Sequence, residues 1–306
     1  MIKLIYKIFL FLLMFIPFLS KSQGDLDSLL DKTLSEAPDY TVATFKTTRI
    51  VTCHSIERTQ QYDLDFRITH RFGSISGGAY ELFGLDHSTS CFEFDYGIFN
   101  WLMAGFSRST FEKTYHGFLK FSLLRQAKGK KNIPLSVSLL TGIYINSLKF
   151  QDTTRTNYFT SRLSYINQLL IARKFNNRLS LQLSPTMIHR NLVENKNINN
   201  DIFSVGFGGR YKITNRTSIN FEYFWIYNRD KISINNNTNP LSIGFDIETG
   251  SHVFQIYLTN DAYITENAFL GNCINKWQNG ELLFGFSITR IFTLSSKTKE
   301  YESLGL

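Results

Sequence analysis

The sequence lacks an apolar stretch long enough to cross a membrane as a helix. Its N-terminal apolar run, residues 8–19, is about 12 residues long and contains Pro17, whereas a spanning helix needs roughly 20. Two lysines precede this run and small residues follow it, so residues 1–22 are interpreted as a signal peptide cleaved before Gln23. The chain is therefore predicted to be exported.

Cysteine is scarce and has no recognisable pattern. Cys53, Cys91 and Cys273 are odd in number and widely spaced, so they cannot all pair within one chain and form no Cys-x-x-Cys metal pair. The six histidines are scattered without metal-ligand spacing. No linear motif couples a histidine to a particular serine or aspartate, as a hydrolase would need. The sequence predicts neither a metal nor a cofactor.

A strong excess of charge is also lacking. The formal net charge is +8, and the predicted signal peptide removes three lysines, leaving about +5. This mild excess does not predict nucleic-acid binding. It favours a polar surface near anionic headgroups, and the expected partners include outer-membrane lipid or lipopolysaccharide.

Aromatic residues are abundant, at 15% of the chain with 28 Phe and 15 Tyr. They recur with a period of two, as in residues 62–72, where Tyr62, Leu64, Phe66 and Ile68 alternate with charged and polar residues. Similar alternation recurs near residues 90–98, 201–213 and 241–249. Such a pattern indicates strands with one apolar and one polar face.

Three features favour a membrane barrel, with its apolar face outward, over a soluble sandwich. The segments run for about nine to thirteen residues, the length that a tilted strand needs to cross the hydrocarbon. Tyr and Trp tend toward segment ends, and short connections alternate with long polar ones. The predicted fold class is therefore all-β, a transmembrane antiparallel β-barrel over residues 62–292. Its twelve strands are expected near 62–72, 90–98, 102–110, 115–125, 133–146, 157–175, 179–190, 201–213, 216–227, 241–249, 252–260 and 281–292.

The regions flanking the barrel are predicted less directly. Residues 41–51 also resemble a strand, but an even strand number favours a place inside the lumen, across the periplasmic mouth, or beside a missed strand. We therefore expect residues 23–61 to be a periplasmic or lumenal segment that starts with a short amphipathic helix. Residues 293–306 are expected to be a periplasmic tail. The aromatic end of the last strand, Phe292, resembles the signal read by the barrel-insertion machinery, an expected partner during biogenesis.

Several strings of the chain resemble an uncharacterised family of β-barrel proteins from Bacteroidota, classed as a domain of unknown function. These strings are FKTTRIV, DFRITHRFG, ELFGLD, FDYGIFNWLMAGFSRST and FLKFSLLRQ. The resemblance spans most of the mature chain. It implies a location in the cell outer membrane and a barrel fold rather than a reaction.

The densest polar cluster is predicted to face the lumen from the first two full strands. It comprises Asp63, Asp65, Arg67, Arg71, Glu93 and Asp95. Such a cluster could form a charge-selective constriction, or an ion-pair network that fills a narrow barrel and joins adjacent strands. The glycines at 206, 208 and 209 lie inside a strand pattern, which favours bulges or close packing over a phosphate loop.

Three functions remain open at this point. The first is a passive outer-membrane channel or transport component for small solutes. The second is a structural or interaction barrel with a filled lumen, which binds a partner through its loops or its N-terminal segment. The third is an outer-membrane hydrolase, which we place last; the chain is not expected to be an enzyme.

Overall fold

The computed structural model describes residues 39–129, 132–150, 154, 156–234 and 237–295. The chain divides into two compact units, and the unit formed by residues 40–127 and 133–306 contains the barrel. Of the other unit, the structure describes Asp39, Lys128, Gly129 and Asn132. The predicted signal peptide, the predicted N-terminal helix and residues 296–306 of the predicted tail lie outside the described residues.

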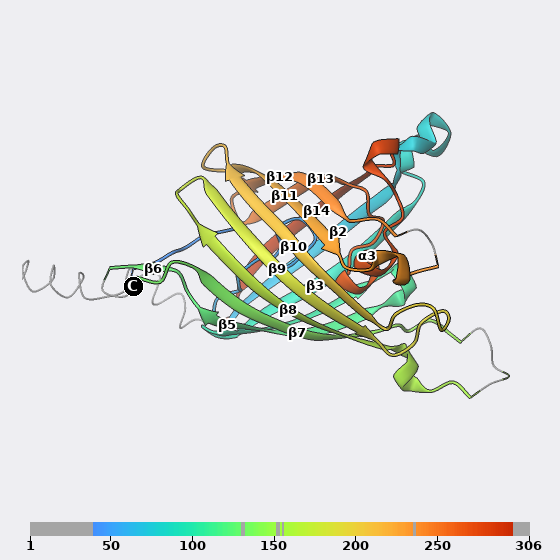
Figure 1. The fold of residues 1–306 in the computed structure, drawn as a ribbon. Helices are drawn as coiled ribbons and strands as arrows, with labels where there is room; N and C mark the ends of the chain where they lie inside the picture. Colours follow the sequence, from blue (N-terminus) through green and yellow to red (C-terminus); the bar gives the residue numbers. More distant parts are fainter. Residues whose placement is uncertain (1–38, 130–131, 151–153, 155, 235–236, 296–306) are drawn as a thin grey trace, which may run out of the picture. The chain divides into compact units, whose positions relative to one another are not determined.

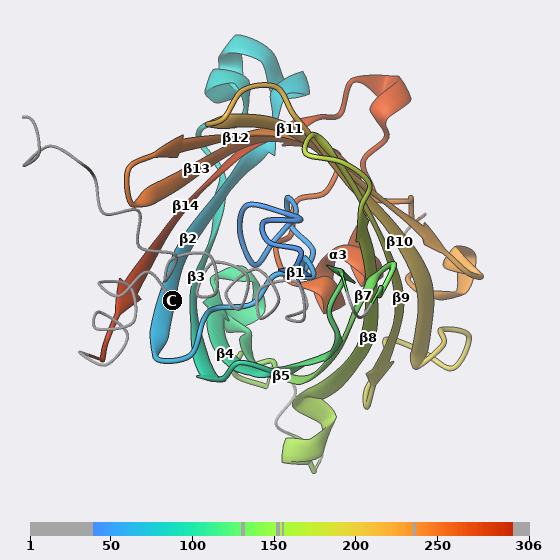
Figure 2. The ribbon, with the colours of Figure 1, turned by 90° about the vertical axis from the view of Figure 1, so that its left-hand side faces the viewer.

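The larger unit is a closed antiparallel β-barrel of twelve strands, seen from the side in Figure 1 and along its axis in Figure 2. The strands are β2 (Asp63–Ser74), β3 (Ser88–Phe99), β4 (Leu102–Ser109), β5 (Tyr115–Leu124), β7 (Ser136–Ile145), β8 (Leu163–Lys174), β9 (Leu179–Arg190), β10 (Asp201–Lys212), β11 (Thr217–Ile226), β12 (Leu241–Thr249), β13 (His252–Thr259) and β14 (Leu283–Thr293). Two short strands, β1 (Asp39–Tyr40) and β6 (Ala127–Lys128), pair in a separate sheet. The predicted fold class and all twelve predicted strands are confirmed.

The two faces of the wall differ in the way that the period of two predicts. In β3, Phe92 and Phe94 are each 43% exposed, whereas Glu93 and Asp95 are 5% and 1% exposed. Successive side chains of a strand point to opposite faces. The phenyl rings therefore line the outside of the barrel and the carboxylates line its interior, as in a membrane barrel.

The barrel closes where β14 pairs with β2, with Ile288 opposite Ile68. Connections at one end are short, for example residues 175–178 and 250–251, and we call it the short-turn end. Connections at the other end, the long-loop end, include residues 227–240 and 260–282. The short helices are η1 (Ile75–Gly84), η2 (Phe111–Lys113), η3 (Phe159–Arg162), η4 (Arg229–Lys231), η5 (Trp277–Asn279) and α3 (Glu266–Asn272). Among the described residues, no helix is both long and apolar enough to cross a membrane.

Residues 44–61 lie inside the barrel and form no thirteenth strand of its wall (Figure 2). The segment turns back on itself, because Arg49 and His54 form an antiparallel bridge. The Ile50 N–H also donates to the Cys53 carbonyl at 2.9 Å. We call this segment the luminal hairpin. Of the three places predicted for residues 41–51, the structure therefore shows the lumen for most of them.

A second insert occupies the lumen beside the hairpin. Helix α3, in the long loop 260–282, buries Phe269 and Leu270 in an apolar cluster inside the barrel. The Phe269 ring lies 5.2 Å from that of Phe224 on β11. Apolar burial of this kind is worth about 1.5–3 kcal/mol for each large side chain, so packing fixes α3 in place.

Candidate functional site: the filled lumen

The tip of the luminal hairpin is held by one carboxylate of the wall. Glu222 on β11 accepts hydrogen bonds from the backbone N–H groups of Val51, Thr52 and Cys53, at 3.0–3.2 Å. Successive backbone N–H groups of a turn form a concave site for an anion. Glu222 is 3% exposed, so this carboxylate supplies the charge that the turn requires.

Other wall side chains bind the carbonyl groups of the hairpin. The Lys120 ammonium donates to the carbonyls of Ser55 at 3.1 Å and Glu57 at 2.9 Å. Further donors come from three more strands: Gln182 to His54 O at 2.8 Å, Gln255 to Ile50 O at 2.9 Å and Arg67 to Val51 O at 2.9 Å. The wall thus satisfies backbone groups that would otherwise be buried without partners.

Two wall glycines allow the hairpin to approach closely. A Cβ atom at Gly208 would overlap Ile50 Cδ1, and one at Gly97 would overlap the Gln60 carbonyl oxygen. The neighbouring Gly206 and Gly209 face aromatic rings of β11 in the same manner. This finding agrees with the predicted close packing of these glycines and not with a phosphate loop.

The hairpin and the α3 loop meet at Arg49. Its guanidinium forms ion pairs with Glu93 of the wall and with Glu266 of α3, the latter at 2.6 Å. The second oxygen of Glu266 accepts from the Tyr144 hydroxyl at 2.8 Å. Nearby, burial lowers the pKa of His54 well below its usual value, with Arg49 and Lys120 adding to the effect, so the imidazole is neutral.

Arg71 connects the wall, the hairpin and the long loop 260–282. Its guanidinium donates to the Asp261 carboxylate at 2.8 Å, to the Tyr263 carbonyl and to the Thr52 hydroxyl at 2.6 Å. Burial raises the pKa of Asp261 to about 7, although Arg71 opposes the shift. A guanidinium with several donors and a fixed charge suits such a three-way junction better than an ammonium would.

All six residues of the predicted cluster face the interior, where each is less than a tenth exposed: Asp63, Asp65, Arg67, Arg71, Glu93 and Asp95. Their partners differ from the predicted strand-to-strand network. Glu93 pairs with the hairpin and Arg71 pairs with the long loop, although Arg67 and Glu93 are register partners. Asp65 and Asp95 lie opposite each other on neighbouring strands.

Four residues that hold the inserts were not singled out from the sequence. Arg49, Glu222 and Lys120 lie in recognised strand-like segments, and Glu266 lies in a long loop. The only available signal was the even strand number, which placed the segment containing Arg49 off the wall. Nothing in the sequence connects Glu222 to a partner, because it binds backbone N–H groups.

A metal site or a Ser-His pair would have to come from the histidines, cysteines and acids elsewhere in the chain. The described residues contain no group of three His, Cys, Asp or Glu side chains placed to hold a metal ion, and all three cysteines are free and buried. His54 and His116 are buried in the lumen. His70 Nδ1 lies 2.7 Å from the Ser90 hydroxyl. A Ser-His pair also needs an acid to orient the imidazole, and no ion pair of this kind occurs at His70 among the described residues.

Comparisons with known proteins agree with the barrel. The profile of a family described as "Membrane bound beta barrel domain (DUF5777)" matches residues 45–292. The NanC porin is 9% identical, with a TM-score of 0.50 over 74% of this chain and 98% of that chain. An outer membrane channel from Pseudomonas putida F1 is 11% identical, with a TM-score of 0.47 over 77% and 97%. Outer membrane phospholipase A from Escherichia coli is 11% identical, with a TM-score of 0.42 over 76% and 91%. No curated protein matches the sequence significantly.

Proposed function

The chain belongs to the DUF5777 family of membrane-bound β-barrel domains, and from this premise we propose that it is an outer-membrane transport component for small polar solutes that is closed at rest. One observation carries the proposal: residues 44–61 of the same chain fill the lumen as an insert, and polar side chains of the wall bind its backbone groups through hydrogen bonds that water could replace. The barrel is therefore a gated passage rather than the open, passive channel first considered.

The wall around the hairpin supports a role in transport. The interior face of β9 carries Ser180, Gln182, Ser184 and Thr186, with Ile188 as the apolar residue that follows them on this face. Polar interiors of this kind line water-filled barrels. Withdrawal of the hairpin would leave hydroxyl and amide groups to hydrate a passage.

The hairpin is the part best suited to move. A typical hydrogen bond contributes about 0.5–1.5 kcal/mol net, because water replaces it on release. The hairpin also buries Phe45, Ile50 and Val51 in the apolar cluster that holds α3. It meets α3 at the Arg49–Glu266 pair, so its release must break apolar and ionic contacts as well as hydrogen bonds. A full passage therefore requires the hairpin to leave and the long loop 260–282 to shift.

A disulfide between the hairpin and the wall tests the proposal. Ile50 Cγ1 and Cγ2 each lie 3.7 Å from the position of a Cβ atom at Gly208, so the side chains at these two positions are in direct contact, as the partners of a disulfide must be. The test protein carries Ile50→Cys and Gly208→Cys, with the three native cysteines replaced by alanine. We expect conductance steps in planar bilayers when mild urea loosens the reduced protein, and none when the disulfide is formed.

The cysteine-free parent, with and without oxidant, is the control for this experiment. Its steps should not respond to redox conditions, and reduction should restore steps to the cross-linked protein. Equal conductance in the oxidised and reduced forms would show that ions do not pass through the space that the hairpin occupies, and the proposal would be wrong.

A second candidate is a barrel that stays filled and acts by binding a partner. The apolar packing of Phe269 and Leu270 inside the wall favours it, because this half of the lumen resembles the core of a soluble protein. If the reduced protein gives no conductance steps under any condition that leaves the barrel folded, partner binding is favoured over transport.

The outer-membrane location belongs to the same proposal. The aromatic and aliphatic residues on the outside of the wall, such as Phe94, Phe207 and Phe245, are 43–45% exposed and need an apolar surrounding. We expect the protein to fractionate with outer membranes and to migrate faster in gels before heating than after it. Recovery in the soluble fraction without detergent would contradict the location.

A further inference from the structure

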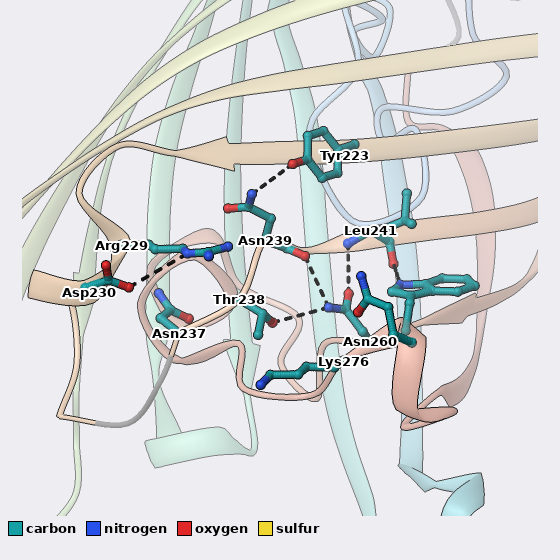
Figure 3. Close-up of a pocket in the computed structure, with 11 residues that line it drawn as sticks. Tyr223, Arg229, Asp230, Asn237, Thr238, Asn239, Leu241, Asn260 and Lys276 are labelled. Atoms are coloured by element: carbon teal, nitrogen blue, oxygen red, sulfur yellow. Dashed lines mark hydrogen bonds and ion pairs between the residues drawn. The ribbon is translucent and has the colours of Figure 1, made fainter.

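A cavity of about 530 Å³ opens at the long-loop end, beside the rim formed by β11 and β12 (Figure 3). Its lining comes from the loops 227–240 and 260–282 and from the strand residues Tyr223 and Leu241. The volume lies within the range of small-molecule sites, roughly 300–1,000 Å³. The lumenal contacts described above do not involve this cavity.

The floor of the cavity is held rigidly by Asn260. Its side-chain oxygen accepts from the Leu241 N–H at 2.8 Å. Its amide nitrogen donates to the carbonyls of Asn239 at 3.1 Å and Asn275 at 2.9 Å. The Trp277 indole donates to the Leu241 carbonyl at 3.0 Å, which fixes its ring at the cavity. A preorganised lining loses little entropy when a ligand binds.

Two cations reach this cavity from different loops. Arg229 lies on η4, and Lys276 immediately precedes η5; Figure 3 shows both side chains at the cavity. Arg229 pairs with Asp230, which also lines the cavity, at 3.8 Å. The Asp230 side chain is 92% exposed, so this ion pair is weak and leaves the guanidinium able to bind a ligand. Arginine and lysine in such positions suit a phosphate or carboxylate.

Neutral polar groups complete the lining. Asn237 is 3% exposed, and its side-chain oxygen has no hydrogen-bond partner among the described residues. The Tyr223 hydroxyl accepts from Asn239 at 2.8 Å and keeps its own hydrogen to donate. A buried acceptor without a partner is unfavourable, so the Asn237 side-chain oxygen is placed to accept a hydrogen bond from a ligand hydroxyl.

We infer that this cavity binds a sugar ring that carries a phosphate or carboxylate group. Arg229 and Lys276 would bind the anionic group, Asn237 and Tyr223 would bind hydroxyls, and the Trp277 ring would cover the less polar face of the sugar. Tyr223 and Leu241 belong to the outward face of the wall, where membrane headgroups are expected. Such a sugar can arrive as a free solute or as the headgroup of a glycolipid, and the inference does not depend on whether the barrel opens.

Trp277 provides the signal for a binding experiment on the full chain in detergent. With Trp101→Phe and Trp225→Phe, Trp277 is the only tryptophan left among three. We expect N-acetylglucosamine 1-phosphate to change its emission saturably. N-acetylglucosamine and inorganic phosphate should each bind at least tenfold more weakly, because each supplies only half of the recognised chemistry.

The double variant Arg229→Gln/Lys276→Gln should raise the Kd at least tenfold. The matched control, Lys212→Gln/Arg216→Gln, removes the same charge from the short connection between β10 and β11, at the opposite end of the barrel, and should leave the Kd unchanged. Equal responses to inorganic phosphate and to the sugar phosphate would overturn the inference. The absence of a saturable response, or an unchanged Kd in the Arg229/Lys276 variant, would do the same.

A second arm of the experiment identifies the source of the sugar. The protein is placed in phosphatidylcholine vesicles with or without lipid A, which bears phosphorylated glucosamine rings. Loss of the response to the free sugar phosphate only when lipid A is present would indicate a glycolipid headgroup. A response that persists would indicate a free solute. Lipid A should alter the Trp277 emission of the Lys212/Arg216 control more than that of the Arg229→Gln/Lys276→Gln variant. An equal effect of lipid A on both variants would mean that it does not act through this cavity, and the inference would fail.

Discussion

Replacing Glu222 with alanine is expected to open the barrel. The substitution leaves the N–H groups of Val51, Thr52 and Cys53 without their acceptor inside the lumen. Each buried donor left unpaired costs about 1–3 kcal/mol, and partial hydration reduces the total to about 3 kcal/mol. Because about 1.4 kcal/mol corresponds to a tenfold change in an equilibrium constant, the open probability in planar bilayers should rise roughly a hundredfold.

Glu281→Ala is the matched control for this prediction. Its carboxylate accepts only from its own loop, from the Lys276 N–H at 2.7 Å and the Asn279 amide at 3.2 Å. The control should have the open probability of the unaltered protein. Glu222→Gln keeps one acceptor oxygen, so its open probability should lie between those of the control and Glu222→Ala. An alanine variant at 222 that is folded but as silent as the control would contradict the role of the hairpin as a gate.

Gly97→Ala should detach the other end of the hairpin from the wall. The new methyl group would overlap the Gln60 carbonyl and lie 2.9 Å from the Thr59 carbonyl oxygen. The backbone must therefore shift, and the bond from the Tyr62 N–H to the Gly97 carbonyl, at 2.9 Å, is lost. We expect trypsin to cleave after Arg58 at least tenfold faster, because proteolysis follows the population of the released segment.

Gly117→Ala provides a matched comparison, since a Cβ atom at this strand glycine would meet nothing within 4 Å. It should be cleaved at the rate of the unaltered chain, and both variants should keep a heat-modifiable mobility. If the two alanine variants resist trypsin equally, the contact at Gly97 does not hold the hairpin in place.

The wall could be predicted from the sequence because its signal is local. Each strand carries its own alternation, as Phe92 and Phe94 do against Glu93 and Asp95. The alternation of apolar and polar side chains does not by itself say which face is outside. The strand lengths and the regular change between short and long loops indicated that the apolar face is outside. The even strand number argued against residues 41–51 as a thirteenth strand, but it left open the lumen, the periplasmic mouth and a place beside a missed strand.

The contents of the lumen could not be predicted, because their contacts are not local. Arg49 pairs with Glu93, which is 44 positions away, and with Glu266, which is 217 positions away. Glu222 binds backbone N–H groups, which every residue except proline carries, so its partner leaves no trace in the sequence. Helix α3 has only seven residues, fewer than periodicity needs to be recognised. The cavity at Arg229 and Lys276 likewise depends on how two distant loops fold.

The hairpin ends at Gln61, and Tyr62 alone separates it from β2. This continuity determines what can happen after the hairpin leaves the lumen. Residues 44–61 can extend over roughly 60 Å at most, yet they stay covalently tethered to the first strand. Rebinding is then a first-order process at an effective concentration in the millimolar range. The rate of return should not depend on how many copies share the membrane, and a single cut after Arg58 would make the change permanent.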